Sequence, residues 1–97
     1  MLFRSKGGYS VQPAIHFDND FSTSASIMEI TARDAFGLLY RIANVLSIHG
    51  CNIEVALIST EGQRAIDVFY LTHKGEKLTP DLERKLEHDL TQTLAHA

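Results

Sequence analysis

The stretch Asp34-Ala35-Phe36-Gly37-Leu38-Leu39-Tyr40 lies between an apolar, strand-like segment and an amphipathic, helix-like one. It predicts a strand-to-helix corner. Asp34 belongs to the residue types that cap helices, and Gly37 has no Cβ, so that backbone or a ligand can approach closely. The first N–H groups of a helix have no intrahelical partner and readily bind a carboxylate or another anion. The corner is therefore either a small-molecule site or an ordinary turn.

Periodic apolar residues on both sides of the corner predict the elements that it joins. Upstream, residues 25–31 alternate like a half-buried strand, with Ile27 opposite Met28 and Ile30. Downstream, residues 36–49 predict a helix that Gly50 ends in a left-handed conformation. The apolar stripe of this helix consists of Leu38, Leu39, Ile42, Val45, Leu46 and His49.

The second half of the chain repeats the pattern with a hairpin and another helix. Residues 52–60 and 64–72 predict two strands joined at residues 61–63, and a turn follows at residues 74–76. The second helix is predicted to start at Thr79, with Pro80 as its first helical residue. Its buried stripe repeats every fourth residue and consists of Leu82, Leu86, Leu90 and Leu94.

The N-terminal part is less regular. Residues 1–10 predict a flexible lead-in, and residues 11–97 a single domain. Residues 11–17 give a weak strand signal, which Pro13 confines to a sheet edge. The order of elements predicts an α+β sandwich, with two helices on one face of an antiparallel sheet. Ferredoxin-like folds usually have a last strand after the second helix, and we expect the N-terminal strand to fill that vacant edge.

Composition excludes several classes of protein. The chain has 97 residues, a net charge of −3 and a pI of about 5.9, which gives no general attraction to nucleic acid or acidic lipid. No apolar run approaches the roughly 20 residues of a membrane span. The only cysteine, Cys51, cannot form an internal disulfide, which favours a cytoplasmic location.

The quoted residues together resemble a known family. The pattern strand, Asp34-x-x-Gly37-Leu38-Leu39, helix, Gly50-x-Asn52-Ile53, hairpin is similar to ACT domains, small modules that regulate enzymes by binding amino acids. More narrowly, Phe17-Asp18-Asn19 and the run from Arg64 to Tyr70 resemble the C-terminal ACT module of protein-PII uridylyltransferase/uridylyl-removing enzymes. The resemblance covers residues 11–95.

The resemblance implies a ferredoxin-like ACT fold and a regulatory, non-catalytic role. The implied role is to sense nitrogen status through an amino acid, most simply glutamine, where two ACT domains meet. The ligand-binding residues that it implies are Asp34, Ala35, Phe36, Gly37, Leu38 and Leu39 of one domain, facing Asn52 and Ile53 of the other. Backbone N–H groups after Gly37 would bind the ligand carboxylate, and Asp34 or the Asn52 carbonyl its ammonium group.

Simpler interpretations of these residues remain open. Gly37 can merely relieve crowding where helix meets sheet, Asp34 can serve only as a helix N-cap, and Asn52 can satisfy local backbone. The family usually has Arg-Pro where this chain has Ala35-Phe36, so the corner loses a pre-set φ and gains an apolar ring. This departure favours the alternative function, a dimerisation module that binds no small ligand.

Other chemistries find little support in the sequence. Asp18-Asn19-Asp20 is most simply a turn, and His88-Asp89 a solvated helix face, so we expect no metal site, no cofactor and no catalytic residue. The third strand does not have the glycine and stacking aromatics of an RNA-recognition module, and its acidic Asp67 would repel phosphate. An acylphosphatase-like enzyme would need a glycine-rich phosphate loop.

The strand at residues 64–72 suggests a partner. Its apolar run at residues 68–71 breaks alternation, so both faces of the sheet need cover and the helices supply only one. A second copy of the domain, or another part of a longer chain, would cover the other. Arg64 and Asp67 could face that partner domain, although exposure to solvent explains Arg64 equally well.

Overall fold

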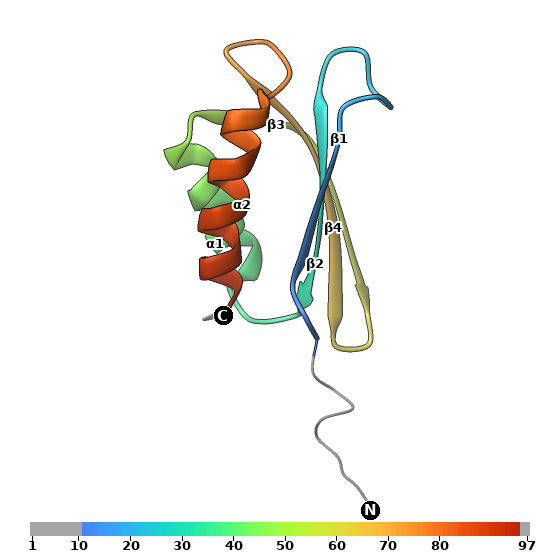
Figure 1. Cartoon of the computed structure of the whole chain (residues 1–97). Helices are drawn as coiled ribbons and strands as arrows, with labels where there is room; N and C mark the ends of the chain where they lie inside the picture. The colour runs from blue at the N-terminus through green and yellow to red at the C-terminus, as the bar shows by residue number, and fades with distance from the viewer. Residues whose placement is uncertain (1–10, 96–97) are drawn as a thin grey trace, which may run out of the picture.

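The computed structural model describes residues 11–95, so the predicted lead-in at residues 1–10 lies outside the described part. Six elements follow one another in the predicted order (Figure 1). They are β1 (Ala14–Asp18), β2 (Ser26–Arg33), α1 (Leu38–Ile48), β3 (Cys51–Glu61), β4 (Arg64–His73) and α2 (Pro80–Ala95).

The four strands form one antiparallel sheet in the order β1-β2-β4-β3. β2 and β3 flank β4, and α1 connects them across the sheet, which is the split arrangement of ferredoxin-like folds. β1 pairs with β2 and occupies the edge that a strand after α2 would otherwise take (Figure 1). The predicted α+β fold and the position of the N-terminal strand are therefore confirmed.

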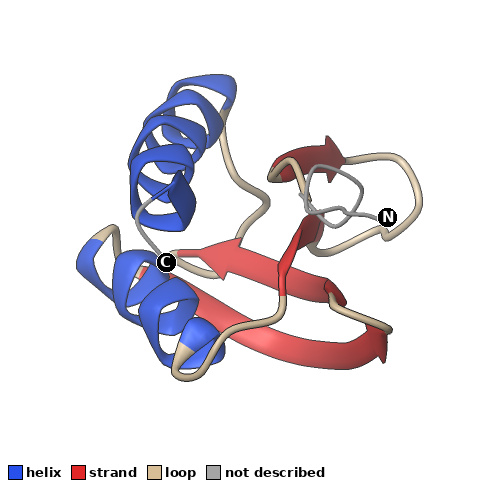
Figure 2. Cartoon of the chain, turned by 90° about the horizontal axis from the view of Figure 1, so that it is seen from below, coloured by secondary structure: helices blue, strands red, loops and turns tan. Residues whose placement is uncertain are grey.

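Both helices pack on the same face of the sheet (Figures 1 and 2). The core between the two layers is apolar because the inward positions of β2 and β4 alternate with outward ones, and both helices turn their stripes inward. Its fully buried large side chains include Met28, Ile30, Ile42, Leu46, Phe69, Leu71, Leu86 and Leu90.

Several element boundaries differ from the prediction. β1 begins at Ala14, because Pro13 has no N–H to donate to a ladder. β2 extends to Arg33, where its pairing with Arg64 carries the ladder to the end of the β3–β4 hairpin. α1 begins at Leu38, two residues later than expected, because Gly37 has a left-handed backbone.

The predicted helix signals at the other ends are confirmed. The Leu82 N–H donates to Thr79 Oγ1 at 3.2 Å, and the Glu83 N–H donates to the Thr79 carbonyl at 3.0 Å, so Thr79 caps α2. Gly50 follows α1 with φ 74° and donates its N–H to the Ser47 carbonyl at 2.9 Å. α1 therefore ends in the left-handed residue that the sequence indicated.

A buried polar network, which the sequence did not reveal, ties the β1–β2 loop to α2. Ser26 is fully buried, donates its hydroxyl to Asn19 Oδ1 and accepts the Leu78 N–H at 2.9 Å. Asn19 donates from Nδ2 to Glu83 Oε2 at 2.7 Å, and Lys77 Nζ donates to the Asn19 carbonyl at 2.6 Å. The loop at that end of the sheet is thus fixed to the start of α2.

A second polar contact joins the two helices. His49 Nε2 lies 2.6 Å from Asp89 Oδ2, across the seam between the end of α1 and the middle of α2. The interpretation of His88-Asp89 as a solvated face is therefore wrong for Asp89, which is half-buried, and correct for the exposed His88. His49 belongs to the inward stripe, as predicted, but contributes a hydrogen bond.

Candidate functional site

The strand-to-helix corner is a tight backbone turn. The Leu38 N–H donates to the Ala35 carbonyl at 3.1 Å, and the Arg41 N–H donates to the Gly37 carbonyl at the same distance. The Asp34 N–H donates to the Gln63 carbonyl at 2.7 Å, which ties the corner to the β3–β4 hairpin. Gly37, not Asp34, is the N-cap of α1, so the prediction that Asp34 caps the helix is wrong.

Gly37 is required by the backbone conformation. Its φ of 77° and ψ of 7° lie in the left-handed region, which residues with a Cβ adopt at a cost. A Cβ built on Gly37 would meet no atom within 4 Å. The interpretation that this glycine relieves crowding between helix and sheet is therefore wrong, and the space beside it is open as far as residues 11–95 define it.

The start of α1 has an uncompensated positive end. No side chain of residues 11–95 caps it, and its first turn contains no acidic residue. By contrast, Asp81 and Glu83 lie in the first turn of α2. Free N–H groups and the helix dipole favour an anion at such a terminus, so the electrostatics of this corner suit a carboxylate.

The predicted corner residues differ in accessibility. Leu38 is buried in the core, and Ala35 is half-buried. Asp34 is exposed, and Phe36 is fully exposed, so its ring does not fill the corner of its own chain. Leu39 is 44% exposed, and its place on the buried stripe was therefore wrong. Together these residues present a surface at the start of α1.

Asn52 and Ile53 lie at the other end of the molecule. They follow α1, and Asn52 pairs with Thr72 near the far end of β4, whereas the corner adjoins Arg64 at its near end. The 11 residues of α1 separate the two groups by about 16 Å, at about 1.5 Å per residue. A single copy of the chain therefore does not bring Asn52 and the corner together.

The structure adds a residue to the neighbourhood of the corner. Asp67 is only 3% exposed, although it is charged, and it alternates with Ala65 and Phe69 on the inward face of β4. Among residues 11–95 its Oδ1 has no hydrogen-bond partner. The expectation that Asp67 faces a partner domain is wrong, since it lies on the face that the helices cover. Arg64 is exposed in the single chain, which fits both solvent and a partner domain.

The environment of Asp67 changes its acidity. Burial raises the pKa of its carboxyl, the Ser59 backbone N–H that bonds the carboxylate lowers it, and the negative charge of Asp34 raises it again. The net result is a pKa above the ordinary value. The corner adjoins the first residue of β4, and Asp67 follows three residues later on the same strand.

The opposite face of the sheet is uncovered by helices (Figure 1) and carries apolar side chains where β4 and β3 lie side by side. In β4 the inward Phe69 and Leu71 are buried, while Val68 and Tyr70 on the other face are half-buried. Beyond them, Val55 and other apolar side chains of the edge strand β3 are exposed. Both faces of β4 carry apolar side chains, as the unbroken apolar run indicated.

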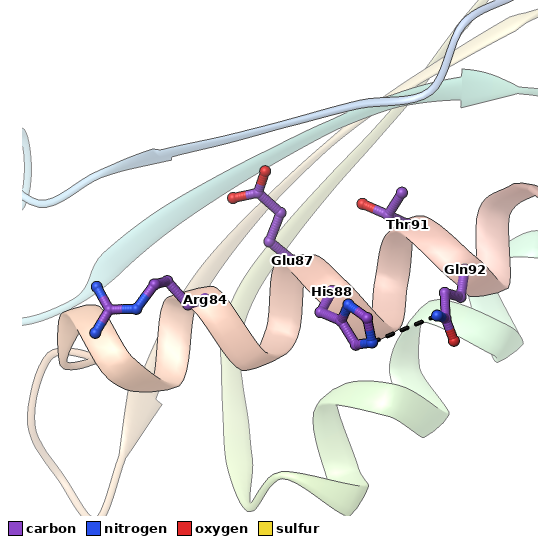
Figure 3. A pocket seen from close by; sticks show the side chains of 5 residues that line it. All are labelled: Arg84, Glu87, His88, Thr91 and Gln92. Carbon is purple, nitrogen blue, oxygen red and sulfur yellow. Dashed lines mark hydrogen bonds between the residues drawn. The ribbon is translucent and has the colours of Figure 1, made fainter.

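A shallow depression lies along α2 (Figure 3). It is lined by Arg84, Glu87, His88, Thr91 and Gln92, all from one helix, and Gln92 Nε2 lies 3.4 Å from His88 Nε2. Within residues 11–95, no group of three or more histidine, cysteine or acidic residues could hold a metal ion. In the same part of the chain, no helix is long and apolar enough to cross a membrane.

Comparison with known proteins agrees with this fold. Residues 14–97 match the family described as ACR9-like, ACT-like domain. Similar curated proteins are bifunctional uridylyltransferase/uridylyl-removing enzymes. One from Azospirillum brasilense is 39% identical over 90 residues, and one from Ralstonia nicotianae is 35% identical over 96 residues.

These matches cover 92% and 97% of this chain but only 9% and 11% of the enzymes, so the chain spans about a tenth of the length of the relatives it matches. A third relative, from Caulobacter vibrioides, is 38% identical over 72 residues, which cover 73% of this chain and 8% of the enzyme. The chain belongs to the ACT-like domain family, and it is homologous to a small part of uridylyltransferase/uridylyl-removing enzymes.

Proposed function

We propose that this chain is a regulatory domain that senses an amino acid, with glutamine as the ligand, in a uridylyltransferase-like enzyme that controls nitrogen metabolism. The observation that carries the proposal is the open start of α1, where Gly37 leaves space and no side chain of residues 11–95 caps the helix. A carboxylate placed there would compensate the positive end of α1. The relatives supply the enzyme class through their names.

The site requires two copies of the domain. The corner and Asn52 lie at opposite ends of α1, so they can surround one small ligand only if they come from different copies. A two-fold axis beside α1 and β3 would bring the corner of one copy to Asn52 and Ile53 of its partner, and would create two equivalent sites. Ligand binding would then favour one arrangement of the domains and shift the activity of the enzyme that carries them.

The first test is calorimetry of the 97-residue chain with glutamine and a panel of other amino acids. We expect binding in the millimolar range or tighter, which corresponds to at least about 4 kcal/mol. Gly37→Ala should weaken binding at least fivefold, because the new Cβ occupies the open corner and disturbs the left-handed turn. The absence of heat and of a thermal shift at 20 mM amino acid, about 20 times a millimolar Kd, would contradict the proposal for this domain.

Gly62→Ala is the matched control. Gly62 also has a positive φ, 63°, and no atom lies within 4 Å of a Cβ built there. Both substitutions should lower the free energy of unfolding by about 1 kcal/mol, because alanine is strained at positive φ. Only Gly37→Ala should change the affinity for glutamine. Equal affinities for both variants would remove the corner from the site.

A mixing experiment tests the shared site. Gly37→Ala and Asn52→Ala homodimers should each have two defective sites. In a mixed dimer one site combines both defects, and the other receives a native corner and a native Asn52. Statistical mixing should therefore restore about one quarter of the sites. If mixing restores no binding although each variant is impaired, the two residues do not form one site between copies.

The second candidate function is a dimerisation module without a small ligand. Its support is the fully exposed ring of Phe36, which stands where the family usually has proline and is free to contact a partner. In this case the chain would dimerise, and neither glutamine nor any other amino acid would change its stability. Light scattering together with the calorimetry therefore separates the two candidates.

A further inference from the structure

Asp67 is the feature that the fold leaves unexplained. Its side chain lies on the inward face of β4 between Ala65 and Phe69, at 3% exposure, and its Oδ1 has no donor among residues 11–95. A buried acceptor without a donor destabilises a fold, and native proteins keep few of them. An apolar residue at this position would continue the core, so we infer that the carboxylate serves a role other than stabilising the fold.

The pairing of the strands fixes its place relative to the corner. Arg33 pairs with Arg64, and the Asp34 N–H bonds the Gln63 carbonyl, so the corner adjoins the first residue of β4. Asp67 follows three residues later, on the face of β4 that the helices cover. Asp34 is the smallest of the causes that act on the pKa of Asp67, after burial and the Ser59 backbone. The unpartnered oxygen therefore lies at the same end of the core as the uncapped start of α1.

The approach from the β3 side is thinly covered. Asp67 pairs with Ile30 on one side and Ile58 on the other. Ile30 is buried, but Ile58 is 52% exposed, because β3 is the edge strand. A small movement of the Ile58 side chain would open a route to the Asp67 carboxylate. A ligand placed at the start of α1 could therefore reach this carboxylate from the edge of the sheet.

The arrangement selects a particular chemical group. Oδ1 of Asp67 has no hydrogen-bond partner among residues 11–95, so this oxygen is available as an acceptor. A guanidinium binds best to both oxygens of a carboxylate, whereas an ammonium group needs single acceptors. Asp34 provides a second negative charge nearby. The uncapped helix start at the same place suits an anion, so the complementary ligand carries an ammonium group and a carboxylate.

We propose that Asp67, assisted by Asp34, receives the primary ammonium group of an amino acid whose carboxylate binds in the first turn of α1, at N–H groups other than that of Leu38, which already donates to the Ala35 carbonyl. The inference rests on the proposed function and adds to it a site residue on β4, outside the corner and outside Asn52. Asp67 is then a binding residue held without a partner in the free domain, and the ligand supplies the missing donor.

The test compares two ligands on matched variants. Glutamine and 4-carbamoylbutanoate differ only in the α-ammonium group. Asp67→Asn should weaken glutamine binding at least tenfold and change the affinity for 4-carbamoylbutanoate less than twofold. Asp20→Asn, an exposed control in the β1–β2 loop, should change neither. If Asp67→Asn binds glutamine within twofold of the natural chain, the inference is overturned while the proposed function stands.

A second measurement keeps the two proposals separate. The ¹³C resonance of the Asp67 carboxyl should shift when glutamine or methylammonium is added, because a bound cation favours the ionised form, and the Asp20 resonance should not. A chain that binds no amino acid but shifts the Asp67 resonance with methylammonium would defeat the proposed function and support the ammonium site. If neither compound shifts the Asp67 resonance selectively, the inference is overturned. Urea denaturation of Asp67→Asn checks folding, and we expect it to be at least as stable as the natural chain.

Discussion

Asp67 makes a specific contribution to how the stability of this domain responds to pH. Its folded-state pKa lies above the ordinary value of 3.8, chiefly because burial disfavours the charged form. Between pH 3.8 and the raised pKa of the folded state, the folded chain binds more protons than the unfolded chain. The free energy of unfolding therefore decreases as pH rises through this range. Below pH 3.8 both states are protonated at this residue, and the cost of burying an ionised carboxylate disappears. This is the reverse of an aspartate held in a salt bridge.

We predict that Asp67→Asn flattens this part of the pH profile. The variant cannot ionise, so the loss of stability above 3.8 should disappear, and at pH 7 the variant should be more stable by about 1 kcal/mol, the scale of an unsatisfied buried group. Urea denaturation from pH 3.5 to 8 measures the effect. Asp20→Asn should leave the profile unchanged. A variant that is less stable than the natural chain at pH 7 would assign Asp67 a structural role.

For single residues, the sequence predicts the face of an element on which a side chain lies better than it predicts the contacts of that side chain. A period of two in β4 already places Asp67 with Ala65 and Phe69 on one face, so its inward direction could have been predicted. The absence of a hydrogen-bond partner for Oδ1 could not have been predicted, because it depends on side chains from other elements. The capping role expected of Asp34 failed for a similar reason. Its N–H is engaged by the Gln63 carbonyl, and the left-handed Gly37 begins the helix instead.

Among the elements, the β1–β2 loop and the start of α2 depend on a single hydroxyl. Ser26 accepts the Leu78 N–H and donates to Asn19, whose own side chain bonds Glu83. The hydroxyl and the Leu78 N–H are buried, whereas Asn19 is half-buried. Removing the hydroxyl would leave the buried Leu78 N–H without a partner and take one hydrogen bond from Asn19.

Ser26→Ala should therefore lower the free energy of unfolding by about 1–3 kcal/mol. Ser47→Ala, on the exposed side of α1, should change it by less than about 0.5 kcal/mol. Hydrogen exchange gives a more local measurement, in which the Leu78 amide should lose protection in the first variant. An unchanged exchange rate for this amide would show that the Ser26 hydroxyl is not its partner in solution.

The elements themselves were largely predictable because they depend on local periodicity. The alternation of apolar and polar residues around Met28 predicted a strand, and the leucine at every fourth residue of α2 predicted a helix. Both elements are present. Boundaries that depend on pairing were missed. Arg33 joins β2 because Arg64 is opposite, a contact between residues far apart in sequence. The network around Ser26 was missed because serine at a strand start has no distinctive pattern.

At the scale of the whole molecule, β3 is the element best suited to contact another protein chain. It is an edge strand of 11 residues, and beyond Cys51 all its residues are exposed. Apolar side chains lie on both of its faces: Leu57 pairs with the outward Val68, and Ile58 with the inward Asp67. A long apolar edge of this kind readily pairs with another chain. The site proposed above would be formed on the face that carries Ile58.

Leu57 and Ile58 form a matched pair for locating the interface. They are neighbours in the chain, 54% and 52% exposed, and lie on opposite faces. If copies associate on the helix side of β3, Ile58→Glu should weaken the dimer at least tenfold and Leu57→Glu much less, because a buried unpaired charge is costly. Light scattering over a concentration series measures both. The opposite ranking would place the interface on the open face of the sheet.

The position of β1 also affects how quickly the domain can assemble. Its pairs with β2 join residues close in sequence, from Asp18 with Ile27 to Ala14 with Thr31. A strand placed after α2 would have to close the same edge over on the order of 65 residues, and such distant contacts slow folding. Because the edge is filled by a local hairpin, the sheet can be completed before α2 has docked. We therefore expect this arrangement to fold faster than one in which the edge strand follows α2.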